Sequence, residues 1–319
     1  MANAPTGVLL LAYGSPETPD DVGPYFVHIR GGRAPSPEAV ENLRQRYASI
    51  GGRTPLLSIT KETASALHAA LNADAPGEYR TYIAMKHWHP FIGDVIPQIA
   101  ADGVRRLIVI VLAPHYSRMS IGGYRKYVDE AIAKLDAPLD LMFVESWHLE
   151  PEFIALIAGR VREGLAALPE GERAGAYVVF SAHSLPERIR TWNDPYESQL
   201  LASCEAVARD VGLRNWRFAW QSAGHTGEPW LGPDIVDYLE TSHAEGVRTV
   251  LSVPIGFVCD HLEVLFDIDH EAAATAAALG MTLRRTRMPN ATPELIAVLA
   301  AVVARAEQPS PAHAAAAGR

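Results

Sequence analysis

Residues 177–190, YVVFSAHSLPERIR, begin as an apolar run rich in valine and then present His183 shortly before a proline. Such a run is typical of a buried strand. Seven more runs of this kind lie along the chain: GVLLLAYG, YRTYIAMKH, RRLIVIVLAPH and LDLMFVES in the first half, then WRFAWQSA, RTVLSVPIG and TLRRTRMP in the second. Longer amphipathic segments separate them, as in β-α units. The sequence predicts an α/β protein of two similar doubly wound, Rossmann-like domains, each with a four-stranded parallel sheet.

Helix starts and composition suggest how the chain is divided. SPEAVENLRQRYASIGG and TPELIAVLAAVVARA each open with Ser or Thr followed by Pro-Glu, a common N-terminal signature of helices. We expect a first domain of residues 1–148 joined by 292–307, and a second of residues 149–291. The remaining residues, 308–319, are small and polar and are predicted to be disordered.

Charge and cysteine content exclude several classes of protein. The chain has 319 residues and a formal net charge of −9, which argues against a nucleic-acid surface. Cys204 and Cys259 are far apart, so a disulfide framework, a zinc knuckle and a Cys-ligated iron–sulfur cluster are not expected. No apolar stretch reaches the roughly 20 residues that span a bilayer. We expect a cytoplasmic monomer without an integral membrane segment.

The segment GFVCDHLEVLFDIDHE, residues 256–271, is the most acidic candidate site. If a helix begins near Asp260, Glu263, Asp267 and Glu271 follow at four-residue intervals and share one face. Like charges at this spacing repel, and the segment contains no Lys or Arg to offset them. A divalent cation such as Mg²⁺ would offset this repulsion, because carboxylate oxygens in a row can bind a hydrated metal ion. A solvated helix face is the alternative.

Two histidines follow predicted strands: His183 in VFSAHSLP and His115 in VLAPHYS. In doubly wound folds, ligands bind beyond the carboxyl ends of the strands. A strand-end histidine is also compatible with a purely structural role, but its ordinary pKa near 6.5 suits proton transfer. Together, His183 and the acidic segment suggest proton abstraction coupled to metal handling.

A basic and aromatic cluster lies in PYFVHIRGGRAP and ENLRQRYASIGGRTP. Arginine forks bind carboxylates and aromatic rings pack against flat apolar ligands, so this cluster is a candidate binding surface. Pairing with nearby Asp20, Glu38 or Glu41 at the surface is the alternative for each arginine. The cluster comprises Arg30, Arg33, Arg44, Arg46 and Arg53 with Tyr25, Phe26 and Tyr47.

Six motifs, in order and spacing, resemble the ferrochelatase family, which inserts ferrous iron into a porphyrin. They are LAYGSP, HIRGGRAP, RYASIGGRTPL, FSAHSLPERI, QSAGHTGEPWLGPDI and VPIGFVCDHLEVLFDIDHE, and the resemblance extends from Val8 to about residue 290. It implies a porphyrin and Fe²⁺ as substrates, a cleft between the two domains, no permanently bound cofactor and transient contacts with other heme-pathway enzymes.

The resemblance also implies residue roles. His183 would be the metal-side base or ligand, facing Glu263, while Asp267 and Glu271 would continue an acidic line along a helix with an irregular turn. Tyr13 matches a tyrosine of the coproporphyrin-type enzymes that can ligate the iron of the product. The residues expected to contact the macrocycle or its propionates are Arg30, Arg46, Tyr47, Thr54 and Tyr124.

Three alternatives remain open. A chelatase for precorrin-like rings would have a similar fold, but such proteins share less of the PWLGPD and DHLE motifs. A non-catalytic heme carrier would need no base facing a carboxylate, so His183 and Glu263 disfavour it. Protoporphyrin IX is the alternative substrate, whereas Tyr13 favours coproporphyrin III.

Overall fold

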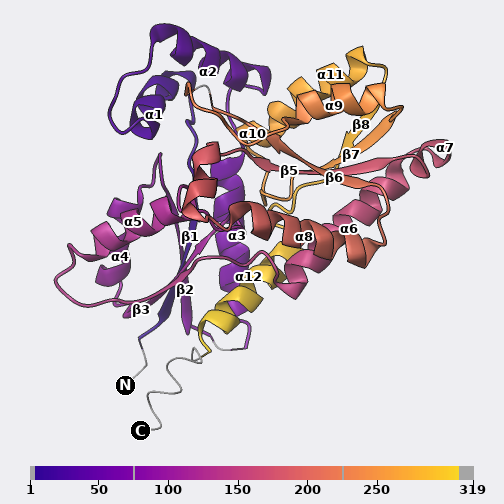
Figure 1. Cartoon of the computed structure of the whole chain (residues 1–319). Helices are drawn as coiled ribbons and strands as arrows, with labels where there is room; N and C mark the ends of the chain where they lie inside the picture. The colour runs from indigo at the N-terminus through magenta and orange to yellow at the C-terminus, as the bar shows by residue number, and fades with distance from the viewer. Residues whose placement is uncertain (1–3, 75, 225, 309–319) are drawn as a thin grey trace.

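The computed structural model describes residues 4–74, 76–224 and 226–308, and its strands form two four-stranded sheets (Figure 1). The first has the order β2-β1-β3-β4, with β1 (Thr6–Ala12), β2 (Tyr79–Met85), β3 (Arg106–Val111) and β4 (Asp140–Val144). The second has the order β6-β5-β7-β8, with β5 (Tyr177–His183), β6 (Trp216–Gln221), β7 (Thr249–Val253) and β8 (Thr282–Arg285). All pairings between these strands are parallel. The predicted α/β fold with two similar sheets is confirmed.

Helices connect the strands and cover the sheets (Figure 1). The first half contains η1 (Pro19–Asp21), α1 (Val22–Ile29), α2 (Pro37–Ser49), α3 (Leu56–Leu71), α4 (Ile92–Ala101) and α5 (Ile121–Ile132). The second half contains α6 (Pro151–Ala167), α7 (Glu170–Arg173), η2 (Glu187–Trp192), α8 (Tyr196–Val211), α9 (Ile235–Ala244), α10 (Leu262–Leu265), η3 (Asp267–Ala272), α11 (Ala273–Ala278) and α12 (Pro293–Ala306). Both helices predicted from Ser/Thr-Pro-Glu starts are present as α2 and α12, and the Ser36 hydroxyl caps α2 by accepting from the Ala39 N–H at 3.1 Å.

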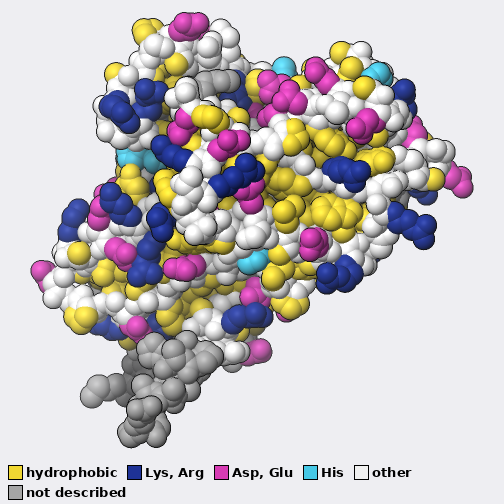
Figure 2. Space-filling model, in the orientation of Figure 1, with side chains coloured by type: hydrophobic (Ala, Val, Ile, Leu, Met, Phe, Trp, Pro, Cys, Tyr) yellow, Lys and Arg dark blue, Asp and Glu magenta, His cyan; other side chains and the backbone are white. Residues whose placement is uncertain are grey.

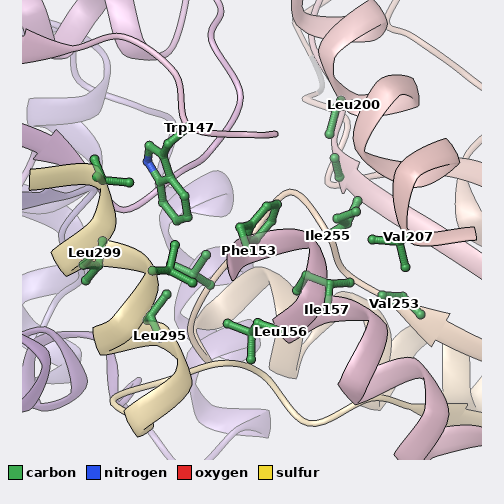
Figure 3. Close-up of a cluster of buried hydrophobic side chains, with 14 of the residues drawn as sticks. Trp147, Phe153, Leu156, Ile157, Leu200, Val207, Val253, Ile255, Leu295 and Leu299 are labelled. Carbon is green, nitrogen blue, oxygen red and sulfur yellow. The ribbon is translucent and has the colours of Figure 1, made fainter. Parts of the chain in front are cut away.

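One hydrophobic core joins the two halves. Figure 3 shows part of it, including Trp147 and Phe153 from the predicted domain boundary, together with Leu295 and Leu299 of α12. The C-terminal helix α12 packs against both α3 and α6. Two aromatic side chains flanking the boundary are therefore part of this core, whereas Leu149 between them is 50% exposed. The division into residues 1–148 plus 292–307 and residues 149–291 stays a prediction.

The uninterrupted helix expected from Asp260 is wrong. A single turn of α10 gives way to the π-helical turn η3, where the Glu271 N–H donates to the Phe266 carbonyl five residues earlier. A π turn inserts an extra residue and rotates the rest of the helix about its axis. Asp267 is 3% exposed, whereas Glu271 lies on the exposed surface. Burial and the nearby charges of Glu263 and Glu271 raise the pKa of Asp267, so the three carboxylates are close enough to interact, and their common line stays a prediction. The irregular turn implied by the family resemblance is present.

The surface carries scattered charge. On the face drawn in Figure 2, basic side chains lie singly among acidic ones. No helix of the described residues is long and apolar enough to cross a membrane. The tail predicted to be disordered, 308–319, lies outside the described residues except for Gln308.

Candidate active site

A cavity of about 520 Å³ is lined by both halves of the molecule, at the carboxyl ends of their strands. Tyr13 follows β1, Lys86 follows β2, His183 ends β5 and Ser222 follows β6. Helices α1 and α2 of the first half also contribute side chains to the wall. The volume is in the range of about 300–1,000 Å³ typical of small-molecule sites. This is where ligands bind in open α/β folds.

His183 and Glu263 face each other in this cavity. The Nε2 atom of His183 lies 3.4 Å from Oε1 of Glu263, while Nε2 of His261 lies 3.6 Å from the other carboxylate oxygen. The Nδ1–H of His183 donates to the carbonyl of Ser184, which fixes the ring and leaves Nε2 toward the carboxylate. The structure thus brings together the two residues that the sequence placed 80 positions apart.

The pair is strongly coupled electrostatically. Burial lowers the pKa of His183, but the Glu263 carboxylate outweighs this effect and raises the pKa to about 9. Burial likewise raises the pKa of Glu263, but His183 and His261 hold it well below its ordinary value. An imidazolium beside a carboxylate is therefore the resting state of the pair at neutral pH.

Tyrosines form much of the wall on the first half's side. Tyr13, Tyr47 and Tyr124 all line the cavity, and the ring of Tyr13 packs on His87 with a centroid distance of 4.5 Å. Burial raises the pKa of Tyr47 to about 12, and the charge of Glu263 contributes to this shift. These phenols are neutral at physiological pH. Tyr13 is 41% exposed, so its ring is accessible from the cavity.

Arg46 and Asp267 pair with each other across the two halves. An Nη2–H of Arg46 donates to Oδ1 of Asp267, and the hydroxyl of Ser222 donates to Oδ2. The Arg46 guanidinium also lies 4.5 Å from the centre of the Phe266 ring. Burial raises the pKa of Asp267 to about 6 although Arg46 opposes the shift. The partner that the acidic segment lacks in sequence comes from α2.

The profile of the family described as Ferrochelatase matches residues 5–307. The chain belongs to the ferrochelatase family. A protein named Ferrochelatase from Herpetosiphon aurantiacus is 49% identical over 301 residues, covering 94% of this chain and 99% of the relative. A Coproporphyrin III ferrochelatase from Oceanobacillus iheyensis is 43% identical over 299 residues, covering 93% and 95%. Members of this family are metal chelatases of the lyase class, and their substrates are a porphyrin and ferrous iron.

The fold is also shared with a distant chelatase. The structure titled SirB from Bacillus subtilis with Fe3+ superimposes with a TM-score of 0.59 at 10% identity, covering 95% of each chain. At this identity the likeness concerns the fold alone. It confirms that the two-sheet architecture of this ferrochelatase family member is chelatase-like.

Two residues expected to touch the porphyrin in this family member do not line the cavity. Thr54 is 6% exposed and donates to the Ser15 hydroxyl at 3.0 Å; Ser15 in turn lies 3.1 Å from the hydroxyl of Tyr47. Thr54 therefore supports the wall from behind. Arg30 is exposed at the end of α1, with its guanidinium 5.9 Å from the Phe26 ring centre.

The metal-binding roles expected for His183, Glu263, Asp267 and Glu271 stay a prediction. His183 and Glu263 are adjacent, but both oxygens of Asp267 already have partners and Glu271 lies on the exposed surface. Within the described ranges, no group of three or more His, Cys, Asp or Glu side chains is arranged to hold a metal ion.

The cavity also contains residues that were not expected from the sequence, among them the polar residues His261, Lys86, Ser15 and Ser222. His261 lies directly before α10 and precedes Glu263 by two residues, and its Nε2 atom lies 3.6 Å from the Glu263 carboxylate. Lys86 lies near the end of the predicted strand YRTYIAMKH and directly follows the observed β2, so its place near the ligand-binding edge could be expected from the sequence. The roles of Ser15 and Ser222 depend on tertiary contacts, and no local sequence pattern indicates them.

Proposed function

We propose that this enzyme inserts Fe²⁺ into coproporphyrin III, giving coproheme and two protons. Tyr13 carries the proposal, since its phenol is accessible on the cavity wall where it could ligate the iron of the product. The name of the Oceanobacillus relative supports this substrate. The Herpetosiphon relative is named only for iron chelation, so protoporphyrin IX is the competing substrate.

His183 and Glu263 handle metal and protons in this proposal. The substrate Fe²⁺ binds the Glu263 carboxylate and replaces the positive charge of the imidazolium, which lets His183 lose its proton. The neutral imidazole then accepts a proton from a pyrrole N–H. The porphyrin gives up its two N–H protons one after the other to His183, which releases each to solvent, and its four nitrogens bind the iron as it leaves the protein carboxylate.

The first half holds the porphyrin. Tyr47, Tyr124 and Arg46 contact the ring or its carboxylates from the cavity wall, while Arg30 acts from the exposed end of α1. Thr54 acts indirectly, through Ser15. Such contacts remote from the reacting nitrogens supply binding energy that holds the ring distorted, with its lone pairs presented to the metal.

The remaining parts of the proposal concern the surroundings of the reaction. Asp267 and Glu271 lie on the outer route of iron, where a secondary divalent cation such as Mg²⁺ would also bind. The enzyme works as a cytoplasmic monomer without a resident cofactor or iron–sulfur cluster, and meets its heme-pathway partners transiently.

Side-by-side kinetics with the two porphyrins test the substrate. Purified protein is assayed anaerobically with Fe²⁺, and kcat/KM is compared for coproporphyrin III and protoporphyrin IX. We expect a clear preference for coproporphyrin III, and the reverse preference would overturn the substrate assignment. His183→Ala should abolish insertion while porphyrin binding remains measurable. Tight heme binding without any turnover by the wild type would instead indicate a carrier.

A further inference from the structure

Lys86 is a buried cation at the inner wall of the cavity. It follows the last residue of β2, and its backbone N–H donates to the Ala12 carbonyl at 2.9 Å, so the neighbouring strand fixes its position. The residue is 9% exposed and lines the cavity. Its Nζ atom lies 4.9 Å from the centre of the Tyr124 ring.

The surroundings of Lys86 are shaped to fit its ammonium group. A Cβ added at Gly123 would lie 2.5 Å from Nζ, so this glycine provides the space that the ammonium occupies. A side chain at position 123 would require this flexible end of Lys86 to shift. The ammonium therefore lies against α5, the helix that also carries Tyr124.

The charge of Lys86 has no anionic partner in the described part of the chain. No carboxylate there lies within 4.0 Å of Nζ, unlike the surface lysine Lys126, which pairs with Glu130 at 3.8 Å. Burial lowers the pKa of Lys86 to about 8, so the amine is still mainly protonated at neutral pH. A buried charge without a partner is unfavourable, and the Tyr124 ring offsets only part of that cost.

We propose that Lys86 is a substrate-binding residue that pairs with a carboxylate of the porphyrin inside the cavity. This inference rests on the proposed function, because it takes a carboxylated porphyrin as the ligand. The carboxylate supplies the missing counter-charge and gains a charge-assisted hydrogen bond. A role in metal delivery does not fit, since an ammonium repels Fe²⁺ and Lys86 belongs to the opposite half of the molecule from Glu263.

The test removes the charge and keeps the length of the side chain. Lys86→Met is compared with the wild type and with Lys126→Met, a matched control on the outer face of α5 whose side chain is 74% exposed. Lys86→Gln is the second neutral variant. The probes are coproporphyrin III and its tetramethyl ester in the same detergent buffer, because these share one ring and differ in charge. Kd is measured by fluorescence titration, and melting temperature by calorimetry without ligand.

We expect both Lys86 variants to bind coproporphyrin III about 10-fold more weakly and the ester as tightly as the wild type does. Without ligand they should melt at or above the wild-type temperature, because an uncompensated buried charge has been removed. Lys126→Met should leave both Kd values unchanged. Equal losses for acid and ester, unchanged binding of the acid, or lower melting temperatures of both Lys86 variants would each overturn the inference.

Failure of the proposed function gives a different result. Charge-dependent porphyrin binding through Lys86 without any metallation by the wild type would contradict the enzyme reaction and leave the Lys86 assignment supported. Normal metallation with unchanged porphyrin binding by both Lys86 variants would contradict only the Lys86 assignment.

Discussion

Arg46→Met should destabilise the empty enzyme through Asp267. Removing one partner of a fully buried ion pair costs about 3–5 kcal/mol, because it leaves the other charge buried alone. Two features reduce that cost here: the Arg46 side chain is 37% exposed, and the Asp267 carboxyl can escape by taking up a proton. We expect a loss of about 1–3 kcal/mol, which for a chain of this length lowers Tm by roughly 2–4 °C.

The effect should depend on pH with a defined sign. The pKa of Asp267 is about 6 in the folded protein, above its ordinary value of 3.8. The folded state therefore holds this proton between the two values, and stability falls as pH rises through that window. Without Arg46 the pKa of Asp267 in the folded protein rises further, so the pH range over which stability falls becomes wider. The destabilisation by Arg46→Met should accordingly be smallest near pH 4 and grow toward pH 8.

Urea unfolding of Arg46→Met, Asp267→Asn and the double variant measures the coupling. The matched control is Arg44→Met on the same helix, whose exposed pair with Glu41 at 2.8 Å should contribute less than about 1 kcal/mol. A coupling energy of about 1–3 kcal/mol is expected between Arg46 and Asp267. Additive single effects, or a defect of Arg46→Met that does not change with pH, would refute the assignment of this pair.

Three further perturbations probe the site. Glu263→Gln should flatten the alkaline stability profile: Glu263 raises the pKa of His183 to about 9 from 6.5, so its contribution is complete below 6.5 and is lost as pH rises through 9. The difference in free energy of unfolding between the wild type and Glu263→Gln, measured with urea, should shrink by about 1–3 kcal/mol from pH 6.5 to pH 9. A difference that stays constant over this range would contradict the coupling. Gly256→Ala would place its Cβ 3.0 Å from a Cα of β5 and should cost about 1–3 kcal/mol in calorimetry, whereas a neutral result would show that the backbone can shift. Thr54→Val removes the donor to Ser15 and should raise KM for porphyrin several-fold with little change in kcat; an equal fall in kcat would mean direct action on the reaction.

The fold was predictable because its signals are local. All eight strands were expected from short apolar runs, and α2 and α12 from their Ser/Thr-Pro-Glu starts. His115 and His183 both follow strands, as expected, but the two strands hold different places in their sheets. β3, which precedes His115, is third in its sheet, whereas β5 is second in its own. Both histidines nevertheless line the cavity, since every parallel strand delivers its following loop to the same edge.

The site was only partly predictable because part of it depends on distant contacts. His183 and Glu263 lie in or next to distinct sequence signals, and the structure brings them to 3.4 Å. Arg46 and Asp267 are 221 positions apart, and no local pattern relates them. The π turn matters in the same way, because four-residue periodicity assumes a regular helix and cannot reveal an inserted residue.

The duplicated topology explains why the cavity has chemically different walls. β1 and β5 occupy the same place in their sheets, and the segments LLLAYGSP and VFSAHSLP end these strands alike. Tyr13 is thereby the positional counterpart of His183, and by the strand registers Lys86 is the counterpart of Gln221 at the end of β6. One half thus presents a neutral phenol and a cation, and the other an imidazole beside a carboxylate. A ring bearing carboxylates and a divalent cation are each suited to a different half, so one repeated fold can hold two substrates of opposite charge against each other.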